Sequence, residues 1–546
     1  MKLCWKSFLA FFLCACLLLS VTSCKKGEDS LAGKSFRWAL SREPKTLDPQ
    51  IASGEDAASV ILALYEGLAR ISEEDDGAQS ATPGAAESWE HNAEYTQWTF
   101  HLRKEAVWSD GETPVTASDF LFAFQRALDP ATGSETCAPM YCIRNGRDIH
   151  DGKKTVDELG VTVKDDYTLI IELEYPNQNF PILTALPVFM PCNEEFFQST
   201  LGRYGLEKST LMGNGPFEID GRYGWEAGKH INVKASDTYS GETAPLPSDV
   251  SFTVGNEEID LSSPVSALTS GSLDAVALTE QETVEAEKAG CSIVSFEDTV
   301  WGLCFNLQDS KLKNTDLRRF FFRSLNREEL LEQLPKSAGE AQGIISPAVT
   351  LEGERYRTMA GGLSFPGQAS EKELSEWLRV GMSALSLDKA PTFTVIYPEE
   401  QEIGPLVNEI LKTWNEATGL YYNMEPLEEE EYNQRISLGD FSAAIYALRP
   451  ESDGSYSTLS AFQSQSSGNV FGYQSEQFDS LLDEIARHSG EDAASLSLKA
   501  ENQLLEDCVF LPLYTGRHFY GMAPDVKGIR FLPYGGGVDF IAAGKE

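Results

Sequence analysis

The chain lacks the short sequence motifs that mark common hydrolases and metal enzymes. Its 546 residues contain no Gly-x-Ser-x-Gly nucleophile motif, no His-Glu-x-x-His zinc motif and no Cys-x-x-Cys pair. The six histidines are scattered singly, so they form no cluster of metal ligands in the sequence. We therefore expect a protein that is not an enzyme and that has no catalytic residues, no metal site and no cofactor.

Basic residues are scarce relative to acidic ones. The chain has 44 Lys and Arg residues against 84 Asp and Glu residues, which gives a formal net charge of -40. A chain of this charge repels nucleic acid and anionic lipid surfaces. We expect no nucleic-acid partner, whereas the acidity by itself identifies no ligand.

Long apolar runs are absent after the first 24 residues, which excludes a transmembrane helix in the rest of the sequence. Residues 1–24 read MKLCWKSFLAFFLCACLLLSVTSC, with two lysines near the start and an apolar run over residues 8–19. That run is too short to span a bilayer comfortably. It is typical of a secretory signal peptide, which we place at residues 1–23.

The leader ends in SVTSC, and the small residues before Cys24 resemble a bacterial lipoprotein box. Cleavage before Cys24 would leave its thiol and its amine free for acylation. We expect an exported protein, in the periplasm or at the cell surface, whose contact with the membrane is a lipid on Cys24 followed by a polar tether over residues 24–33. Plain secretion with an incidental Cys24, or cleavage before Cys16, are the alternatives.

Few cysteines remain after the leader. Their even number permits disulfides in an exported protein, and Cys137 and Cys142 are close enough in sequence to pair across a short loop. Buried free thiols are an equally good interpretation. The six cysteines are Cys137, Cys142, Cys192, Cys291, Cys304 and Cys508.

The most distinctive stretch of the sequence covers residues 47–130. Within it, QWTFHL at residues 97–102 alternates apolar and polar side chains, which predicts a half-buried strand. Asp110 and the glycine after it indicate a turn. Thr116 with Asp119 three residues later predicts the capping box of a helix with one apolar face.

Taken together, these elements closely resemble the N-terminal signature of periplasmic oligopeptide-binding proteins, which belong to family 5 of the bacterial extracellular solute-binding proteins. Three later blocks continue the resemblance: LMGNGPFEIDGRYGWEAGKHINVKASDTY, CFNLQDSKLKNTDLRRFFFRSLNREEL and VFLPLYTGRHFYGMAPDVKGIRF. The first of them is not a phosphate loop, because it lacks a Gly-Lys-Ser/Thr ending.

Between these blocks, strand-like and helix-like segments alternate, as in PTFTVIYPE, the apolar stripe from Leu406 to Trp414, and LYYNMEPL. This order predicts a mainly parallel sheet with right-handed crossovers. The resemblance implies an α/β, two-lobe periplasmic-binding-protein-like fold of type II, in the large cluster that has an extra inserted subdomain, with the ligand cleft between the lobes. The implied parts are lobe I at residues 25–66, 188–298 and 512–546, the subdomain at 67–187, lobe II at 299–511, and hinge strands near 297–301 and 509–514.

The resemblance implies a monomeric receptor that captures oligopeptides and delivers them to the permease subunits of an ABC transporter. In oligopeptide-binding relatives, a Trp-x-x-Asp segment of the second lobe holds the amino terminus of the peptide. Ungapped matching of IYALRPESDGSYSTLSAF places Tyr446 at the tryptophan, Arg449 at the aspartate and Tyr456 at a downstream aromatic residue. An arginine there favours a carboxylate or another anion. A shifted alignment moves the acid to Asp453, and in a third interpretation Arg449 faces solvent and the site lies elsewhere.

Four further residues are weaker candidates for ligand binding. Glu43 lies in the segment that lines the cleft floor of relatives, and Tyr141 lies where relatives place an aromatic lid. Asn214 and Gly215 could offer amide or backbone donors. For each, a purely structural role is at least as good an interpretation. The departure at Arg449 also leaves open the same fold with a non-peptide or anionic ligand, such as an oligosaccharide or a chelated metal, or a role as sensor or adhesin.

Overall fold

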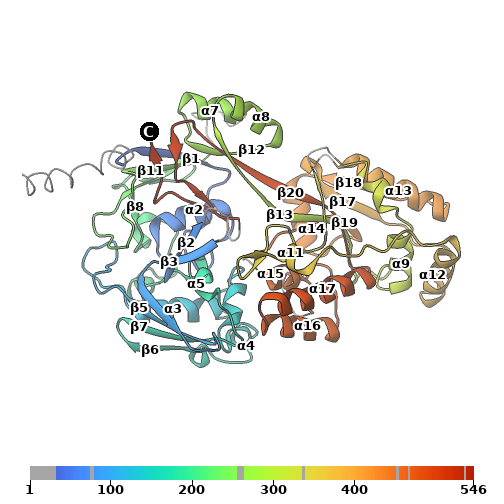
Figure 1. The fold of residues 1–546 in the computed structure, drawn as a ribbon, viewed down its shortest axis with the longest axis horizontal. Coiled ribbons are helices and arrows are strands. Elements are labelled where there is room, and N and C mark those ends of the chain that lie inside the picture. The colour runs from blue at the N-terminus through green and yellow to red at the C-terminus, as the bar shows by residue number, and fades with distance from the viewer. Residues whose placement is uncertain are drawn as a thin grey trace, which may run out of the picture.

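The computed structural model describes residues 32–73, 79–254, 263–334, 338–401, 403–450, 454–464, 466, 468–533 and 536–546. The leader, Cys24 and Asp453 lie outside the described residues. The chain forms two lobes that are joined by two long strands, β13 (Ser292–Phe305) and β20 (Phe510–Met522) (Figure 1).

One mixed sheet runs through both lobes. Its strand order is β18 (Asn423–Leu427), β17 (Thr394–Pro398), β19 (Ala443–Leu448), β13, β20, β12 (Ala275–Leu278), β1 (Ser35–Leu40), β11 (Asp249–Val254), β10 (His230–Ala235) and β8 (Phe217–Ile219). Two short strands join the side of this path: β14 (Gly339–Glu340) pairs with β20, and β9 (Trp225–Glu226) pairs with β10.

The prediction of a mainly parallel sheet is confirmed for β17 and β18, the two segments on which it was based, but it does not hold for the sheet as a whole. Strand β1 is parallel to β11 and β12, and β17 is parallel to β18 and β19. In contrast, β13 is antiparallel to both β19 and β20, and β12, β10 and β8 also make antiparallel pairs. The pair of β13 with β20 is antiparallel because the chain leaves the first lobe on β13 and returns on β20, so the two crossing strands run in opposite directions.

The two crossing strands are irregular where they pass between the lobes. The register shifts between Phe296 and Thr299, which places Glu297 and Asp298 in a bulge of β13. Residues 514–518 of β20 lie opposite this segment, a few positions later than the sequence suggested for the second hinge strand. A bulge bends a strand and changes the direction of its side chains. Asp298 therefore lies outside the regular pairing of β13 with β20.

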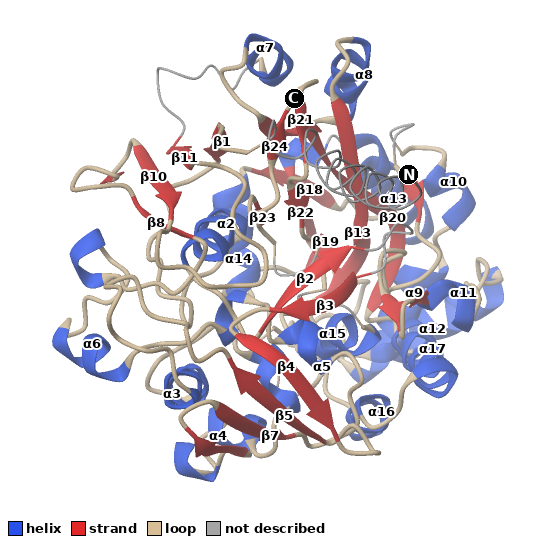
Figure 2. Ribbon diagram, turned by 60° about the vertical axis from the view of Figure 1, so that its left-hand side comes forward, coloured by secondary structure: helices blue, strands red, loops and turns tan. Residues whose placement is uncertain are grey.

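The first lobe and the inserted subdomain share one hydrophobic core. The lobe contributes Phe36 and Phe252, while the subdomain contributes Phe100 and Phe120. The subdomain contains a four-stranded antiparallel sheet in the order β4 (Ala86–His91), β5 (Gln97–Leu102), β7 (Thr168–Glu172) and β6 (Val161–Asp165) (Figure 2). A separate ribbon is formed by β2 (Ala69–Glu73) and β3 (Gln79–Pro83).

All three local predictions for the subdomain are confirmed, including the turn at Asp110, where Gly111 N donates to Trp108 O at 2.9 Å. QWTFHL forms β5, and Trp98, Phe100 and Leu102 are its buried positions. Helix α3 (Ala117–Leu128) begins with the expected capping box, in which Thr116 N donates to Asp119 at 2.7 Å. The other helices of the first lobe and subdomain are α2 (Glu55–Leu64), α4 (Gly146–His150), α5 (Phe180–Leu183), α6 (Glu194–Ser199), α7 (Pro264–Ser270) and α8 (Glu280–Lys288).

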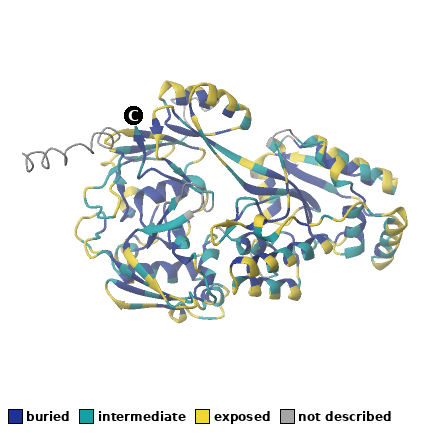
Figure 3. Ribbon diagram, in the orientation of Figure 1, coloured by how far each residue is buried: buried dark blue, intermediate teal, exposed yellow. Residues whose placement is uncertain are grey.

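Helices cover both faces of the sheet in the second lobe. On one face, Leu303 and Phe305 of β13 pack with α9 (Thr315–Arg323) and α13 (Gly404–Thr418). On the other face, Cys304 packs with α14 (Glu429–Ser437), α15 (Ser455–Leu459), α16 (Glu476–Ala486) and α17 (Gly490–Glu506). Figure 3 shows buried residues concentrated in the strands and exposed residues on outer helices such as α12 (Glu371–Ala384). The lobe also contains α10 (Arg327–Leu331), α11 (Tyr356–Ala360) and the hairpin of β15 (Thr350–Leu351) and β16 (Glu354–Arg355).

The six cysteines after the leader are all buried, and Cys137 and Cys142 do not form a disulfide with each other. Desolvation raises the pKa of the Cys142 thiol to about 12, which keeps it protonated and unreactive near neutral pH. The interpretation of these residues as buried thiols is the one that the structure confirms.

Candidate functional site

A chain of cavities lies between the two lobes. We call the one next to the crossing strands the hinge cavity; its volume is about 250 Å³. It is lined by Ala52, Ser53, Gly54, Glu55, Ala58, Ile61, Thr136, Pro139, Leu186, Pro187 and Val188 from the first lobe and subdomain, by Arg449 and Pro450 from the second lobe, and by Gly536. Pro139 also lines the next cavity, so the two adjoin.

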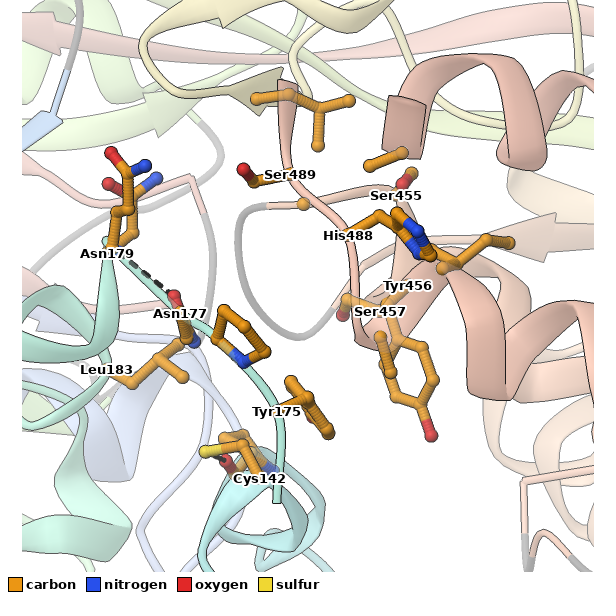
Figure 4. A pocket seen from close by; sticks show the side chains of 18 of the residues that line it. Cys142, Tyr175, Asn177, Asn179, Leu183, Ser455, Tyr456, Ser457, His488 and Ser489 are labelled. Carbon is orange, nitrogen blue, oxygen red and sulfur yellow. Dashed lines mark hydrogen bonds between the residues drawn. The ribbon is translucent and has the colours of Figure 1, made fainter. Parts of the chain in front are cut away.

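The second cavity, which we call the subdomain cavity, has a volume of about 190 Å³. Figure 4 shows its two walls facing each other: Tyr175, Asn177 and Asn179 project from the subdomain, and Tyr456 and His488 project from the second lobe. Amide side chains are frequent on the subdomain wall, and serine side chains are frequent on the second-lobe wall. This tract can therefore offer many neutral hydrogen-bonding groups to a ligand.

Two contacts join the lobes beside the subdomain cavity. The Tyr175 and Tyr456 rings face each other with centroids 6.5 Å apart. Arg147 Nη1 donates to Gln463 Oε1 at 3.1 Å, while the Arg147 guanidinium lies 4.8 Å from the centroid of the Tyr141 ring. Desolvation raises the pKa of Tyr175 and of Tyr456, so both phenols stay neutral. Tyr141 thus lies on the cavity wall, and it positions an arginine that spans the lobes.

Arg449 follows the end of β19 and lies between the lobes at the wall of the hinge cavity. Its Nη1 forms an ion pair of 2.5 Å with Glu55 Oε1 at the start of α2 in the first lobe. Its Nε donates to Asp298 Oδ2 at 2.9 Å, and its Nη2 donates weakly to the Pro533 carbonyl at 3.4 Å. Asp298 also accepts a hydrogen bond of 2.7 Å from His518 Nδ1 on the other crossing strand.

The carboxylate of Asp298 is fully buried and is held ionised by its neighbours. Burial alone would raise the pKa of Asp298, but the hydrogen bond and charge of His518 and the charge of Arg449 lower it below its usual value. Two carboxylates, those of Glu55 and Asp298, contact the single guanidinium of Arg449. Arg449 is therefore already neutralised inside the protein.

Tyr446 lies on β19 and is half-buried, with its ring edge to face against Phe471 at 5.3 Å between centroids. It packs against the core of the second lobe and lines neither of the two cavities. Glu43 lies in the first lobe, where its carboxylate accepts a hydrogen bond from Gly228 N at 2.9 Å, and it too is outside these cavities.

Asn214 and Gly215 shape the backbone at the end of α2. The Asn214 side chain is buried and bonds both backbone groups of Glu66, accepting from N at 3.0 Å and donating to O at 2.9 Å. Gly215 N donates to Leu64 O at 2.9 Å, and a Cβ at Gly215 would lie 2.5 Å from the Leu64 carbonyl carbon. The side-chain amide of Asn214 and the backbone N–H of Gly215 therefore both have hydrogen-bond partners within the fold.

Reasoning from the sequence missed several residues that form the walls between the lobes, notably Glu55, Asp298, Arg147 and Tyr175. No sequence pattern distinguishes Glu55 and Asp298, because carboxylates are common throughout so acidic a chain. Matching to the family pattern identified Tyr456 only as a downstream aromatic residue. The structure places it on the wall of the subdomain cavity.

Among the described residues, no three His, Cys, Asp or Glu side chains lie close enough to hold a metal ion. Within the same part of the chain, every helix is too short or too polar to cross a bilayer.

Two lobes that are joined by a pair of strands and enclose cavities define the two-lobe class of solute-binding proteins. Residues 80–469 match the family of bacterial extracellular solute-binding proteins, family 5 (middle region). The chain belongs to this family.

Individual relatives match along nearly the whole chain. The dipeptide-binding protein DppE of Bacillus subtilis is 27% identical over 500 residues, which cover 90% of this chain and 89% of the relative. The periplasmic oligopeptide-binding protein OppA of Haemophilus influenzae is 26% identical over 497 residues, with 89% of each chain covered. The substrate-binding domain of an oligopeptide ABC transporter from Bacillus anthracis superposes with a TM-score of 0.75 at 24% identity, covering 94% of this chain and 99% of that domain.

Proposed function

We propose that this protein captures oligopeptides between its two lobes and delivers them to the permease subunits of an ABC importer. The observation that carries the proposal is the row of adjoining cavities between the lobes in a chain of this family. An extended ligand suits such a row better than a compact one. The names of the relatives, dipeptide-binding and oligopeptide-binding, support the same class of ligand.

The proposal extends to location and assembly. The protein would be exported, cleaved before Cys24 and held at a membrane surface by lipid on that residue, and it would act as a monomer. It would have no enzymatic activity, consistent with the binding role of its family.

An anionic ligand anchored on Arg449 is the less favoured candidate. A guanidinium binds a carboxylate well when its charge is available, but here Glu55 and Asp298 already balance that charge. The neutral amide, serine and tyrosine groups of the subdomain cavity suit the backbone of a peptide, as in strand-like recognition.

Native mass spectrometry of the purified full chain tests the ligand class. We expect the purified protein to carry bound molecules. Once denaturation releases them, their masses and fragments should identify them as short peptides. Calorimetry with a defined mixture of peptides of two to five residues should show saturable binding. Recovery of an oligosaccharide or a metal chelate, with no binding from the peptide mixture, would overturn the proposal.

A further inference from the structure

We propose that the hinge cavity is a specificity pocket that takes one apolar side chain of the bound peptide. This inference rests on the proposed function and goes further, because it names the kind of residue that the protein selects. The volume of about 250 Å³ is below the range of roughly 300–1,000 Å³ that encloses a whole drug-sized ligand. The cavity therefore fits part of a longer ligand, such as one side chain.

The lining of the hinge cavity is mainly apolar. The apolar side chains of the first lobe and subdomain in this lining are each less than one-tenth exposed: Ala52, Ala58, Ile61, Leu186 and Val188. Proline rings from both lobes complete the lining. Transfer of an apolar side chain from water into such a cavity is favourable in proportion to the area that it buries.

One polar atom in this lining has no partner. The buried hydroxyl of Thr136 finds no hydrogen-bond partner among the described residues, although buried polar groups in proteins are nearly always paired. A hydroxyl can donate to a carbonyl or accept from an amide. We assign Thr136 to a hydrogen bond with the peptide main chain at the residue whose side chain enters the cavity.

The charged side chains of the cavity disfavour an acidic side chain in the same place. Arg449 is paired with Glu55 at the cavity wall and with Asp298 behind it, so two carboxylates already balance its charge. A carboxylate entering the cavity would lose its hydration without gaining a free cation. The pocket should therefore rank a leucine or phenylalanine side chain above alanine, and alanine above aspartate.

The experiment uses a set of tetrapeptides: tetra-alanine, and its variants with a single Leu, Phe or Asp at each of the four positions. Calorimetry with the full chain should reveal one position at which Leu or Phe binds about tenfold or more tightly than Ala. Asp at that same position should bind more weakly than Ala.

The matched pair of protein variants is Ala58→Leu, which fills the hinge cavity, and Ala493→Leu, which makes the same change in the subdomain cavity. Only Ala58→Leu should abolish the preference for Leu and Phe at that position.

Thr136→Val serves as the second variant and does not depend on how Ala58→Leu folds. Removing an unpaired buried hydroxyl should leave the melting temperature of the unliganded protein unchanged or raised, while binding of all the tetrapeptides weakens about fivefold.

Two outcomes would overturn the proposal. If the tetrapeptides bind but no position prefers an apolar side chain, the hinge cavity is not a specificity pocket, although the proposed peptide-binding function stands. If no tetrapeptide or peptide of the mixture binds, the proposed function fails, and the pocket fails with it.

Discussion

Arg449 of the second lobe and Glu55 of the first lobe form an ion pair of 2.5 Å across the space between the lobes. The same guanidinium bonds Asp298 in the bulge of β13, the strand that connects the lobes. Through Arg449, each lobe is thus tied to the other and to the hinge. Opening the lobes would separate at least the pair with Glu55, so this contact favours the closed arrangement.

The first prediction concerns the stability that Arg449 provides. Arg449→Ala removes a charge-assisted bond to the buried Asp298 and should lower the free energy of unfolding by about 1.5–3 kcal/mol. Arg42→Ala is the matched control, because Arg42 pairs with Glu429 across the lobes at 3.6 Å with both side chains well exposed. Its effect should stay below about 1 kcal/mol. Urea unfolding followed by circular dichroism measures both, and equal losses would contradict the role of Arg449.

The second prediction concerns pH. The pKa of Asp298 is lowered in the folded state, so its contribution to stability is present above the unfolded pKa of about 3.9 and is lost as the pH falls through the folded value. Asp298→Asn should therefore be less stable than the wild type at pH 7, and this difference should shrink as the pH falls below about 4. Urea unfolding of both proteins across this range is the measurement. A difference that stays constant with pH would mean that the carboxylate charge of Asp298 does not contribute.

Local structure could be predicted well from the sequence, because its signals lie within a few residues of one another. The alternation in QWTFHL and the Thr116–Asp119 capping box identified β5 and the start of α3 correctly. The apolar stripe from Leu406 to Trp414 lies on helix α13, which is followed by Gly419 in a left-handed backbone conformation with φ of 68°. PTFTVIYPE contains strand β17, in which Val395, Ile396 and Tyr397 are all buried because helices cover both faces of the sheet there.

The site was harder to predict, because its contacts join segments that are far apart in the sequence. Arg449 was found as a departure from a family pattern, but its partners Glu55 and Asp298 are two among 84 acidic residues. No local pattern distinguishes them from acids on the surface. Asn214 was a candidate because its amide could donate to a ligand, yet in the structure this amide holds the backbone of Glu66.

The third prediction separates such a structural residue from the ligand site. Asn214→Ala leaves the buried backbone N–H and C=O of Glu66 without their partners, which should cost about 2–4 kcal/mol of stability. Glu43→Ala, which loses one exposed contact with Gly228, should cost under about 0.5 kcal/mol. Thermal and urea unfolding compare the two. Peptide affinity measured at a temperature where both variants are folded should be nearly unchanged, and a large loss for Asn214→Ala would place its amide in the ligand site.

The fourth prediction concerns the membrane anchor. Because the apolar leader ends in SVTSC, cleavage and lipid attachment at Cys24 should hold the protein in the membrane fraction. Cys24→Ser should release it into the soluble fraction, whereas Cys16→Ser should leave it anchored. Metabolic labelling with palmitate should mark the wild type and Cys16→Ser but not Cys24→Ser. An unlabelled wild type would show that the protein is secreted without lipid.

The fifth prediction concerns closure at the end of the cleft far from the hinge. Arg147 stacks on Tyr141 of the same subdomain and reaches across the lobes to Gln463. The hydrogen bond with Gln463 forms only when the lobes are closed. Arg147→Ala should therefore weaken peptide binding about fivefold, the equivalent of one hydrogen bond of about 1 kcal/mol.

Arg144→Ala is the matched control on the same subdomain, because Arg144 pairs with Glu172 within the subdomain and its side chain is half exposed. It should leave affinity unchanged. Small-angle scattering adds the conformational readout: saturating peptide should reduce the radius of gyration of the wild type and of Arg144→Ala, since only the closed state makes both sets of contacts. Arg147→Ala should need more peptide to reach the same compaction. If the wild type binds peptide without becoming more compact, the lobes do not close on the ligand, and the contact between Arg147 and Gln463 cannot be coupled to binding.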